Sequence, residues 1–212
     1  MKVLAINGSP NNSGNTKFAL NIIGDEIKNC DIEFEILDIG LELFKGCTAC
    51  GHCMNHKTGE CVIKNDNVNF YLSKIIEADA LILGSPTYFG GMTGPLKSFL
   101  DRAFLVATIG SEEPKLAQKI AAGISTVRRG GGVDVINSFN HYFQEAGMII
   151  PGSTYWNIIF GTYPGDCEKD EEGIQTLRVL GKNIVYLLKM KQGSDFILPP
   201  KSEKKILTDF IK

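Results

Sequence analysis

The sequence lacks both a strong charge imbalance and a long apolar run. Its 22 basic and 24 acidic side chains leave a formal net charge of -2 at pH 7. A chain this close to neutral has no field that attracts nucleic acid or an anionic membrane, so we expect a small-molecule or protein partner. No segment approaches the roughly 18 consecutive apolar residues of a membrane span, and no secretory leader pattern opens the chain. We therefore expect a cytoplasmic protein that binds neither nucleic acid nor membrane.

Two common phosphate-binding fingerprints are also missing. Neither G-x-G-x-x-G nor G-x-x-x-x-G-K-[ST] follows the first apolar run, at residues 1–6. This absence argues against a P-loop enzyme and against a standard dinucleotide fold. Asp38 stands near the end of the second expected strand, but without the glycine fingerprint a ribose contact there is unsupported.

The chain does contain a regular alternation of strand and helix patterns. Short apolar runs predict strands at residues 1–6, 32–36, 80–83, 119–124 and 148–150, and residues 151–166 read as irregular. Helical spacing of apolar residues predicts helices between these strands and from residue 171 to 188. This order predicts an α/β protein with a doubly wound parallel sheet. A length of 212 residues with 43% apolar content suits one domain, residues 1–190, followed by a Lys-rich tail, residues 191–212, that is either flexible or packed on a neighbouring subunit.

Polar and glycine residues gather where the first strand ends. Ligands of open parallel sheets bind outside the carboxyl ends of the strands. Backbone N–H groups, hydroxyls and a helix dipole together hold a phosphate without a cation, although an ordinary capped turn has the same composition. The candidate phosphate-binding residues at this exit are Ser9, Asn11, Ser13, Gly14, Asn15 and Thr16.

Two later strand exits suit a flat ring. The exit after residue 84 combines a stiffening proline, two aromatics and paired glycines, which would support an isoalloxazine ring, unless the aromatics are core. Its candidates are Ser85, Pro86, Thr87, Tyr88, Phe89, Gly90 and Gly91. The exit after residue 124 offers a glycine nest with two cations, which would contact a flavin edge or a nicotinamide nucleotide phosphate, or else would be solvated. Its candidates are Arg128, Arg129, Gly130 and Gly131.

Four of the six cysteines form a compact C-x2-C-x2-C-x7-C motif: Cys47, Cys50, Cys53 and Cys61. Four thiolates with two successive x2 spacings suit a [4Fe-4S] cluster. Zinc sites usually present two separated C-x2-C pairs, so zinc is a weaker interpretation, and plain thiols are a third. We expect His52 and His56 to flank the site without serving as ligands. Cys30 and Cys167 are given no role.

These loops resemble those of a known family. The segments Gly8-Ser9-Pro10 with Ser13 to Thr16, Ser85 to Gly90, and Gly130 to Gly132 resemble the FMN-binding loops of the flavodoxin-like NAD(P)H-dependent FMN reductases. The cysteine motif and residues 151–157 are similar to the iron-sulfur flavoprotein branch of that family. The resemblance implies a flavodoxin-like sheet of five strands in three layers, with a cysteine-rich loop, residues 46–62, inserted after the second strand.

The resemblance also implies cofactors and an assembly. FMN would place its phosphate on Ser9, Ser13, Asn15 and Thr16 and its ring against residues 86–91, and the four cysteines would hold a [4Fe-4S] cluster. The protein would be a homodimer or homotetramer, with the cluster of one subunit near the FMN of its neighbour.

The expected function is electron transfer between the cluster and FMN by an FMN-dependent oxidoreductase. The donor would be ferredoxin or NAD(P)H, and small acceptors would be reduced. We nominate no catalytic acid or base, because the flavin itself carries the hydride chemistry. The alternatives are a cluster-free NAD(P)H-dependent FMN or quinone reductase and a non-enzymatic, flavodoxin-like electron carrier.

Overall fold

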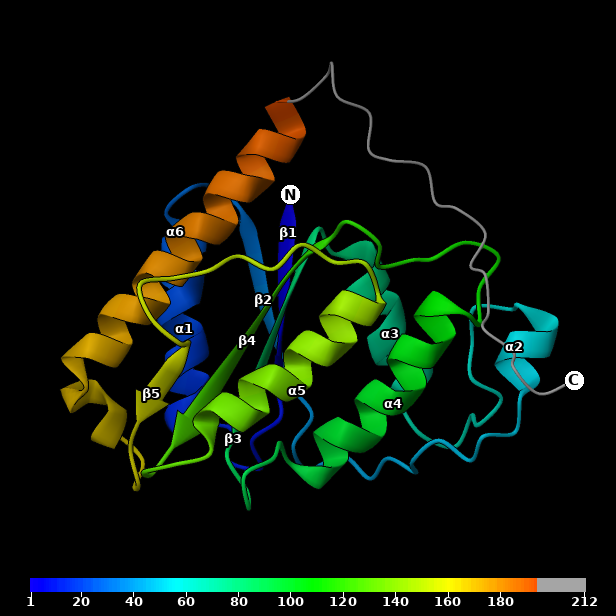
Figure 1. Ribbon diagram of the computed structural model, residues 1–212, viewed down its shortest axis with the longest axis horizontal. Helices are drawn as coiled ribbons and strands as arrows, with labels where there is room; N and C mark the ends of the chain where they lie inside the picture. Colours follow the sequence, from blue (N-terminus) through cyan, green and yellow to red (C-terminus); the bar gives the residue numbers. More distant parts are fainter. Residues whose placement is uncertain (194–212) are drawn as a thin grey trace, which may run out of the picture.

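A five-stranded parallel sheet in the order β2-β1-β3-β4-β5 forms the centre of the protein (Figure 1). The computed structural model describes residues 1–193. The strands are β1 (Lys2–Asn7), β2 (Glu33–Asp38), β3 (Ala80–Pro86), β4 (Ile120–Val127) and β5 (Ile158–Phe160). This is the strand order of flavodoxin-like folds, so the expected doubly wound five-stranded sheet is confirmed.

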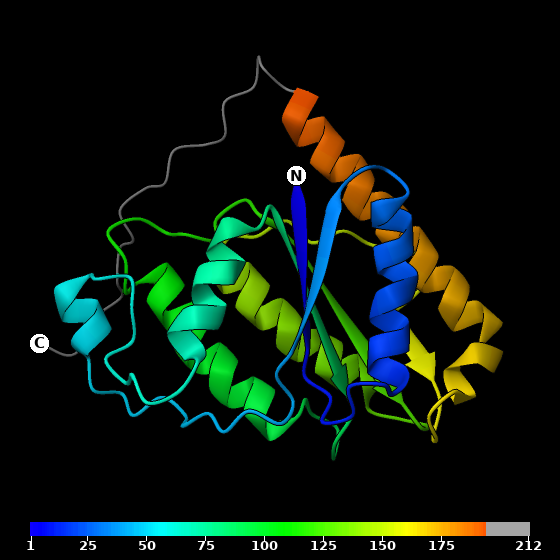
Figure 2. The same cartoon turned by 180° about the vertical axis from the view of Figure 1, so that it is seen from behind.

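Helices cover both faces of the sheet and make three layers (Figures 1 and 2). The helices are α1 (Asn15–Lys28), α2 (His52–His56), α3 (Val68–Glu77), α4 (Gly94–Thr108), α5 (Gly132–Glu145), η1 (Asp166–Lys169) and α6 (Glu171–Gly193). One apolar core lies between the sheet and α1 and α6, and the other lies between the sheet and α3, α4 and α5. Within residues 1–193, no helix has both the length and the apolar character that a membrane crossing needs.

The two cores explain why the central strands are almost continuously apolar. In β1, Val3 and Ala5 belong to the α1–α6 core, while Leu4 and Ile6 belong to the opposite core, and all four side chains are fully buried. A parallel strand covered on both faces needs apolar residues at every position. The edge strand β2 is only partly buried, which agrees with its alternating sequence.

The last strand differs from the prediction. The expected strand at residues 148–150 is wrong: Ile149 forms only an isolated bridge to Ile120, at the start of β4. Pro151 follows directly, and proline has no N–H to continue a ladder. The chain leaves the sheet edge there and returns as β5, inside the segment that was expected to be irregular.

The loop between β2 and α3 carries the four clustered cysteines and the short helix α2, and it lies beside the carboxyl end of α4 (Figures 1 and 2). Its tip is tied there by a hydrogen bond from the Gly59 N–H to the Gly110 carbonyl of 3.0 Å. At the other end of the chain, α6 continues through Gly193, and the rest of the expected tail lies outside the described residues.

Candidate functional site

A cavity of about 250 Å³ opens where β1, β3 and β4 end. Because parallel strands end at one edge of the sheet, residues far apart in the sequence meet there. Three separate loops contribute to its wall, together with residues that follow β5. The lining comprises Ser9, Pro10, Asn11, Gly14, Asn15, Thr16, Pro86, Thr87, Tyr88, Thr126, Val127, Arg128, Gly161, Thr162 and Pro164.

Successive hydrogen bonds from backbone N–H groups to side-chain oxygens hold the loop after β1 in place. Buried Asn7 accepts from the Ser9 N–H at 3.1 Å, and the Ser9 hydroxyl accepts from the Asn11 N–H at 3.1 Å. Asn11 Oδ1 in turn accepts from the Ser13 N–H at 3.1 Å. These turns use the side-chain oxygens of Asn7, Ser9 and Asn11 as acceptors, and they hold the shape of the loop. Asp38 accepts from Asn7 at 2.8 Å and pairs with Lys17, an ion pair that was not predicted from the sequence.

The amino end of α1 faces this cavity and is open to an anion. Its N-cap, Gly14, makes no side-chain cap, and the first turn contains no acidic residue. The cavity lining includes no aspartate or glutamate and does include Arg128. Unpaired N–H groups and the helix dipole favour a negative charge at such an end. The buried Thr16 hydroxyl lies 2.8 Å from that of Thr126 and joins α1 to β4.

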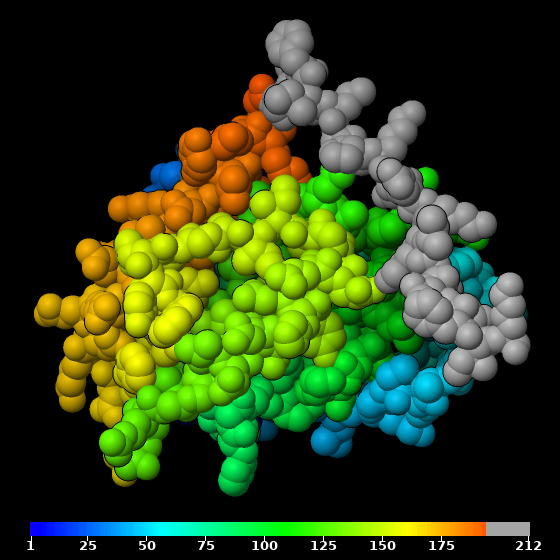
Figure 3. All heavy atoms as spheres, in the orientation of Figure 1, coloured from blue at the N-terminus to red at the C-terminus, as the bar shows by residue number. Residues whose placement is uncertain are grey.

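The loop after β3 projects a tight turn from the strand exits. Tyr88 and Gly91 exchange two backbone hydrogen bonds, of 2.8 and 2.9 Å, and Phe89 and Gly90 both have positive φ. Figure 3 shows this segment as a finger at the edge of the molecule. The Phe89 ring is fully exposed, so it is not core. Ser85 is buried and accepts from the Thr93 N–H at 3.1 Å, which ties the loop to the start of α4.

The loop after β4 borders a second cavity of about 280 Å³. The two cavities share Val127, so they adjoin. Gly131 has a φ of +86°, and a Cβ there would lie 3.0 Å from Gly90 Cα and from Thr87 Cγ2. The third loop thus packs directly on the second. The second cavity is lined in part by Arg129, Gly130, Gly131, Tyr155, Trp156 and Phe160.

The structure brings together nine of the expected cofactor-binding residues in the first cavity: Ser9, Asn11, Gly14, Asn15, Thr16, Pro86, Thr87, Tyr88 and Arg128. Arg129, Gly130 and Gly131 line the adjoining cavity, and five lie outside both linings: Ser13, Ser85, Phe89, Gly90 and Gly91. The Asn15 side-chain amide donates to the Tyr163 carbonyl at 3.0 Å and accepts from the Gly165 N–H at 3.1 Å, so it is already paired within the chain.

The part of the wall that follows β5, at Gly161, Thr162 and Pro164, was not predicted from the sequence. The available signal was the short apolar run Ile158 to Phe160 followed by glycine, which has the form of a further strand exit.

The four clustered cysteines line one pocket of about 150 Å³ beside α4. Its other walls are mostly apolar, and no histidine or carboxylate lines it. Cys53 is buried, and its pKa is raised by burial and also by the nearby thiols of Cys61, Cys47 and Cys50. A bound cation would reverse this effect, because it favours thiolate over thiol.

The donor set fits an iron-sulfur cluster. Four sulfur ligands with mostly apolar walls suit iron and sulfide chemistry, and the lining has no histidine or carboxylate to compete for the metal. Within residues 1–193, no group of three or more Cys, His, Asp or Glu side chains is arranged to bind a single metal ion. A cubane takes one thiolate at each of four irons, so its ligands surround a pocket instead of converging on one point. The rings of His52 and His56 contact each other in a tilted arrangement, with centroids 4.3 Å apart, and both residues lie outside the lining.

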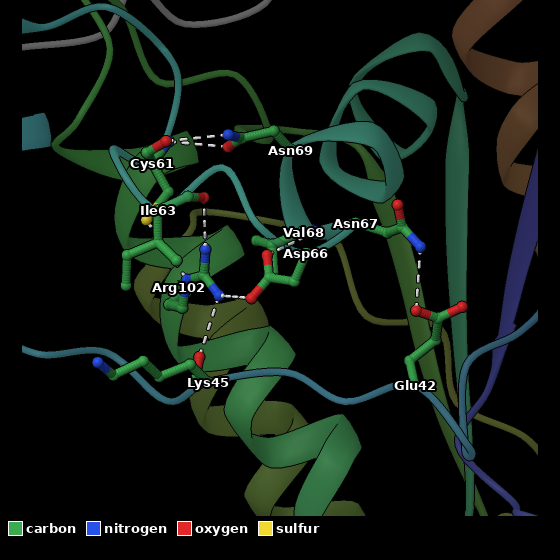
Figure 4. A network of polar contacts seen from close by, with 9 residues as sticks. All are labelled: Glu42, Lys45, Cys61, Ile63, Asp66, Asn67, Val68, Asn69 and Arg102. Atoms are coloured by element: carbon green, nitrogen blue, oxygen red, sulfur yellow. Dashed lines mark hydrogen bonds and ion pairs between the residues drawn. The ribbon is translucent and has the colours of Figure 1, made fainter.

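A network of polar contacts holds the far end of this loop (Figure 4). The Asn69 amide accepts from the Cys61 N–H at 2.8 Å and donates to its carbonyl at 2.9 Å. Buried Arg102 donates to Cys61 Sγ at 3.3 Å and pairs with Asp66. Burial alone would raise the pKa of Asp66, but the hydrogen bonds and charge, led by Arg102, lower it below its usual value.

Arg102 was not found from the sequence, although a signal was present. It lies on α4 three residues after Phe99 and four before Val106, both of which are buried. An arginine at an inward position of an apolar helix needs buried partners.

The remaining two cysteines lie apart from this pocket. Cys167 is fully buried, and burial raises the pKa of its thiol to about 12. Cys30 is partly buried at the end of α1.

Comparison with known proteins places this geometry in a family. Residues 1–162 match the NADPH-dependent FMN reductase family. The chain is 35% identical to an iron-sulfur flavoprotein of Methanocaldococcus jannaschii, over 90% of this chain and 98% of that one. It is 37% identical to one of Archaeoglobus fulgidus, over 87% and 94%. A solved flavodoxin from the domain Archaea has the same fold, with a TM-score of 0.57 and 18% identity over 89% of this chain and 99% of that one. The chain belongs to the iron-sulfur flavoprotein branch of the NADPH-dependent FMN reductase family, and it is an FMN-dependent oxidoreductase.

Proposed function

We propose that the protein moves electrons between a [4Fe-4S] cluster and FMN, taking them from ferredoxin or NAD(P)H and passing them to small acceptors. The observation that carries the proposal is the presence of two unlike sites in one chain: an anion cavity at the strand exits and a four-thiol pocket beside α4. When bound, the flavin interconverts two-electron and one-electron transfer, and the cluster exchanges single electrons.

The strand-exit cavities would hold FMN. The phosphate would lie at the amino end of α1, near the Ser9 hydroxyl and the N–H groups of Gly14, Asn15 and Thr16. The ring would lie against Pro86 to Gly91 and extend toward the adjoining cavity at Arg129 to Gly131. Three features support this placement: the cavity lacks acidic residues, the α1 terminus is uncapped, and the two cavities adjoin at Val127.

The cluster would be bound by Cys47, Cys50, Cys53 and Cys61. Leu105 and Val106 would form an apolar wall on the α4 side of the cluster, while Cys47 and Cys50 lie at its exposed side. All four thiols must lose their protons for iron to bind, so cluster assembly releases protons and is favoured at higher pH.

A homodimer or homotetramer would connect the two sites. The strand-exit cavity and the cysteine pocket share no lining residue. Figures 1 and 2 both show α2 and β5 at opposite sides of the molecule. A path from one subunit's cluster to its neighbour's FMN would avoid crossing the core. Exposed Tyr155 and Trp156, beside the second cavity, offer apolar surface for such a contact. We also propose a cytoplasmic location for this assembly.

The test is anaerobic purification followed by measurement of iron, acid-labile sulfide, zinc and flavin. We expect about four irons, about four sulfides and one FMN per chain. Bound flavin without iron or sulfide would favour the cluster-free reductase. Full cofactors with no turnover of any small acceptor would favour a non-enzymatic carrier.

A Cys50→Ala variant separates the two sites. Cys50 lines the cysteine pocket and lies outside both strand-exit cavities. We expect loss of iron and sulfide with FMN retained at wild-type stoichiometry. Joint loss of iron and flavin would contradict the separation of the sites. Cys30→Ala is the matched control, and it should keep both cofactors.

A further inference from the structure

Arg102 is a buried cation that the proposed function leaves unexplained. Its side chain is 1% exposed. The guanidinium makes four hydrogen bonds, and all of them reach the segment that contains the cysteine motif (Figure 4). Nε donates to Cys61 Sγ at 3.3 Å, Nη1 donates to the Lys45 carbonyl at 3.0 Å and to Asp66, and Nη2 donates to the Ile63 carbonyl at 3.0 Å.

The partners of Arg102 lie on both sides of the motif. Lys45 precedes Cys47 by two residues, and Ile63 follows Cys61 by two. One side chain on α4 therefore joins the entry and the exit of the cysteine loop. Arginine suits this position because its planar fork presents several fixed donors at once. The helix thus fixes the distance between the two ends of the loop.

The contact to Cys61 has a second consequence. A hydrogen bond to a ligand sulfur withdraws electron density from it and stabilises the more negatively charged, reduced form of a cluster. The formal charge of Arg102 is offset by Asp66, whose side chain is 8% exposed. The long-range field of the pair is therefore small, and the directed Nε–H group remains as the local influence on Cys61.

We propose that Arg102 is a positioning residue for the iron-sulfur centre: it joins the two ends of the cysteine loop and, by donating Nε–H to Cys61, raises the reduction potential of the cluster. The inference rests on the proposed function, because it takes Cys61 as a ligand.

Arg102→Lys separates the hydrogen bond from the charge. Lysine keeps the cation, and its single ammonium pairs with the Asp66 carboxylate, its charged partner, so the donor to Cys61 is lost. If Arg102 acted on the cluster through its charge alone, the reduction potential of Arg102→Lys would equal that of wild type. Arg102→Gln removes both the charge and the fork. Lys97→Gln is the matched control, since it removes a cation from the exposed side of the same helix.

The experiment uses the full chain, purified anaerobically and reconstituted with ferrous iron, sulfide and FMN. Electron paramagnetic resonance follows a redox titration of the cluster, and iron, sulfide and flavin are counted per chain. In iron-free protein, mass spectrometry follows the rate at which iodoacetamide alkylates Cys61.

We expect Arg102→Lys to keep FMN and to shift the cluster to a more negative potential, with the reduced-to-oxidised ratio at the wild-type midpoint falling about tenfold, or about 59 mV for one electron. Arg102→Gln should lose more than half of the iron, and its Cys61 should be alkylated several-fold faster. Lys97→Gln should match wild type in every readout.

A wild-type reduction potential in Arg102→Lys would overturn the effect of Arg102 on the cluster's potential. An unchanged rate of Cys61 alkylation in Arg102→Gln would overturn the role of Arg102 in joining the two ends of the cysteine loop. Loss of FMN together with iron would also overturn the inference, because it would mark a general folding role. Absence of iron and sulfide from wild type would instead overturn the proposed function. The alkylation rates of Cys61 would still show whether Arg102 joins the two ends of the cysteine loop.

Discussion

At the scale of single residues, the anion cavity depends on Asn11 being neutral. Its Oδ1 accepts from the Ser13 N–H and hydroxyl, at 3.1 and 3.2 Å. A carboxylate of the same shape would accept both bonds equally well. It would also bring a negative charge to a cavity whose lining has no acidic residue.

Asn11→Asp should therefore weaken FMN binding without disturbing the fold. Repulsion between the new carboxylate and the phosphate should cost about 2 kcal/mol at an effective dielectric constant near 20, or roughly thirtyfold in Kd. Flavin-fluorescence titration measures this, and the loss should shrink as salt is added, because salt screens exposed charges. Asn12→Asp is the control, since Asn12 is exposed and lies outside the lining. Equal Kd values for the two variants would contradict a phosphate at this end of α1.

The sequence patterns predicted which types of residue lie at the site, but they did not predict the role of each individual residue. Glycine and hydroxyl residues near a strand exit predict an anion site because the backbone supplies most of the donors. The tasks depend on tertiary contacts. Asn15 looked like a phosphate ligand, yet its amide is bonded to the chain near residue 163. Ser85 looked like a ring contact, yet it anchors the start of α4.

At the scale of elements, the loop after β2 supports the loop after β1. A Cβ on Gly40 would lie 2.1 Å from the carbonyl carbon and oxygen of Ser9. These are backbone atoms, so they cannot rotate away from the added group. The close approach of the two loops therefore requires glycine at this position, and it holds the Ser9 backbone in place.

Gly40→Ala should consequently affect both stability and cofactor binding. Overpacking of this kind costs about 1–3 kcal/mol in the free energy of unfolding. Displacement of Ser9 should also weaken FMN binding. Urea unfolding and flavin titration measure the two effects. Gly152→Ala is the matched control, because nothing lies within 4 Å of its added Cβ. A normal Kd in Gly40→Ala would show that the Ser9 loop does not contact FMN.

The contact between α4 and α5 should make stability depend on alkaline pH. Burial, and then the hydrogen bond to Asp101, raise the pKa of Tyr142 to about 12 from its usual 10.0. The folded state favours the protonated phenol, so this contribution is complete below pH 10 and is lost as the pH rises toward 12. In Tyr142→Phe, the free energy of unfolding should fall less steeply over that range, by at most about 1.4 kcal/mol per pH unit. Urea unfolding between pH 9 and 12 checks this, and parallel profiles would refute it.

Strands and helices with a clear apolar pattern over many residues were predicted correctly, whereas the short strand β5 was not. The central strands are apolar on both faces, and α1, α3 and α5 have apolar stripes, so each was visible in the sequence. β5 has only three residues, and its place is set by pairing with β4 at Ser125 to Val127. The run at Met148 to Ile150 is as apolar, but Pro151 stops it from continuing the ladder. Pairing of this kind is tertiary and is not encoded in local periodicity.

At the scale of the whole molecule, the separation of the two sites decides which subunit an electron must reach. A path within one chain would have to connect two pockets that share no lining residue. A path between chains requires only that the α2 side of one subunit face the strand exits of another. These two possibilities differ in what a mixed oligomer can do.

Mixed oligomers should therefore recover activity that neither variant has alone. Cys50→Ala subunits are expected to keep FMN but lack the cluster. Subunits with Asn11→Asp and Arg128→Glu are expected to keep the cluster but lack FMN, because both changes place negative charge in the phosphate cavity. In a mixed pair, the cluster of the second subunit can reduce the FMN of the first only if electrons cross between chains.

Co-expression with two affinity tags isolates such pairs, and reduction of FMN by dithionite-reduced cluster is followed by stopped-flow absorbance. Recovery of up to half of the wild-type amplitude is expected. An amplitude no larger than that of Cys50→Ala alone, in pairs verified to contain both chains, would place the electron path within one subunit.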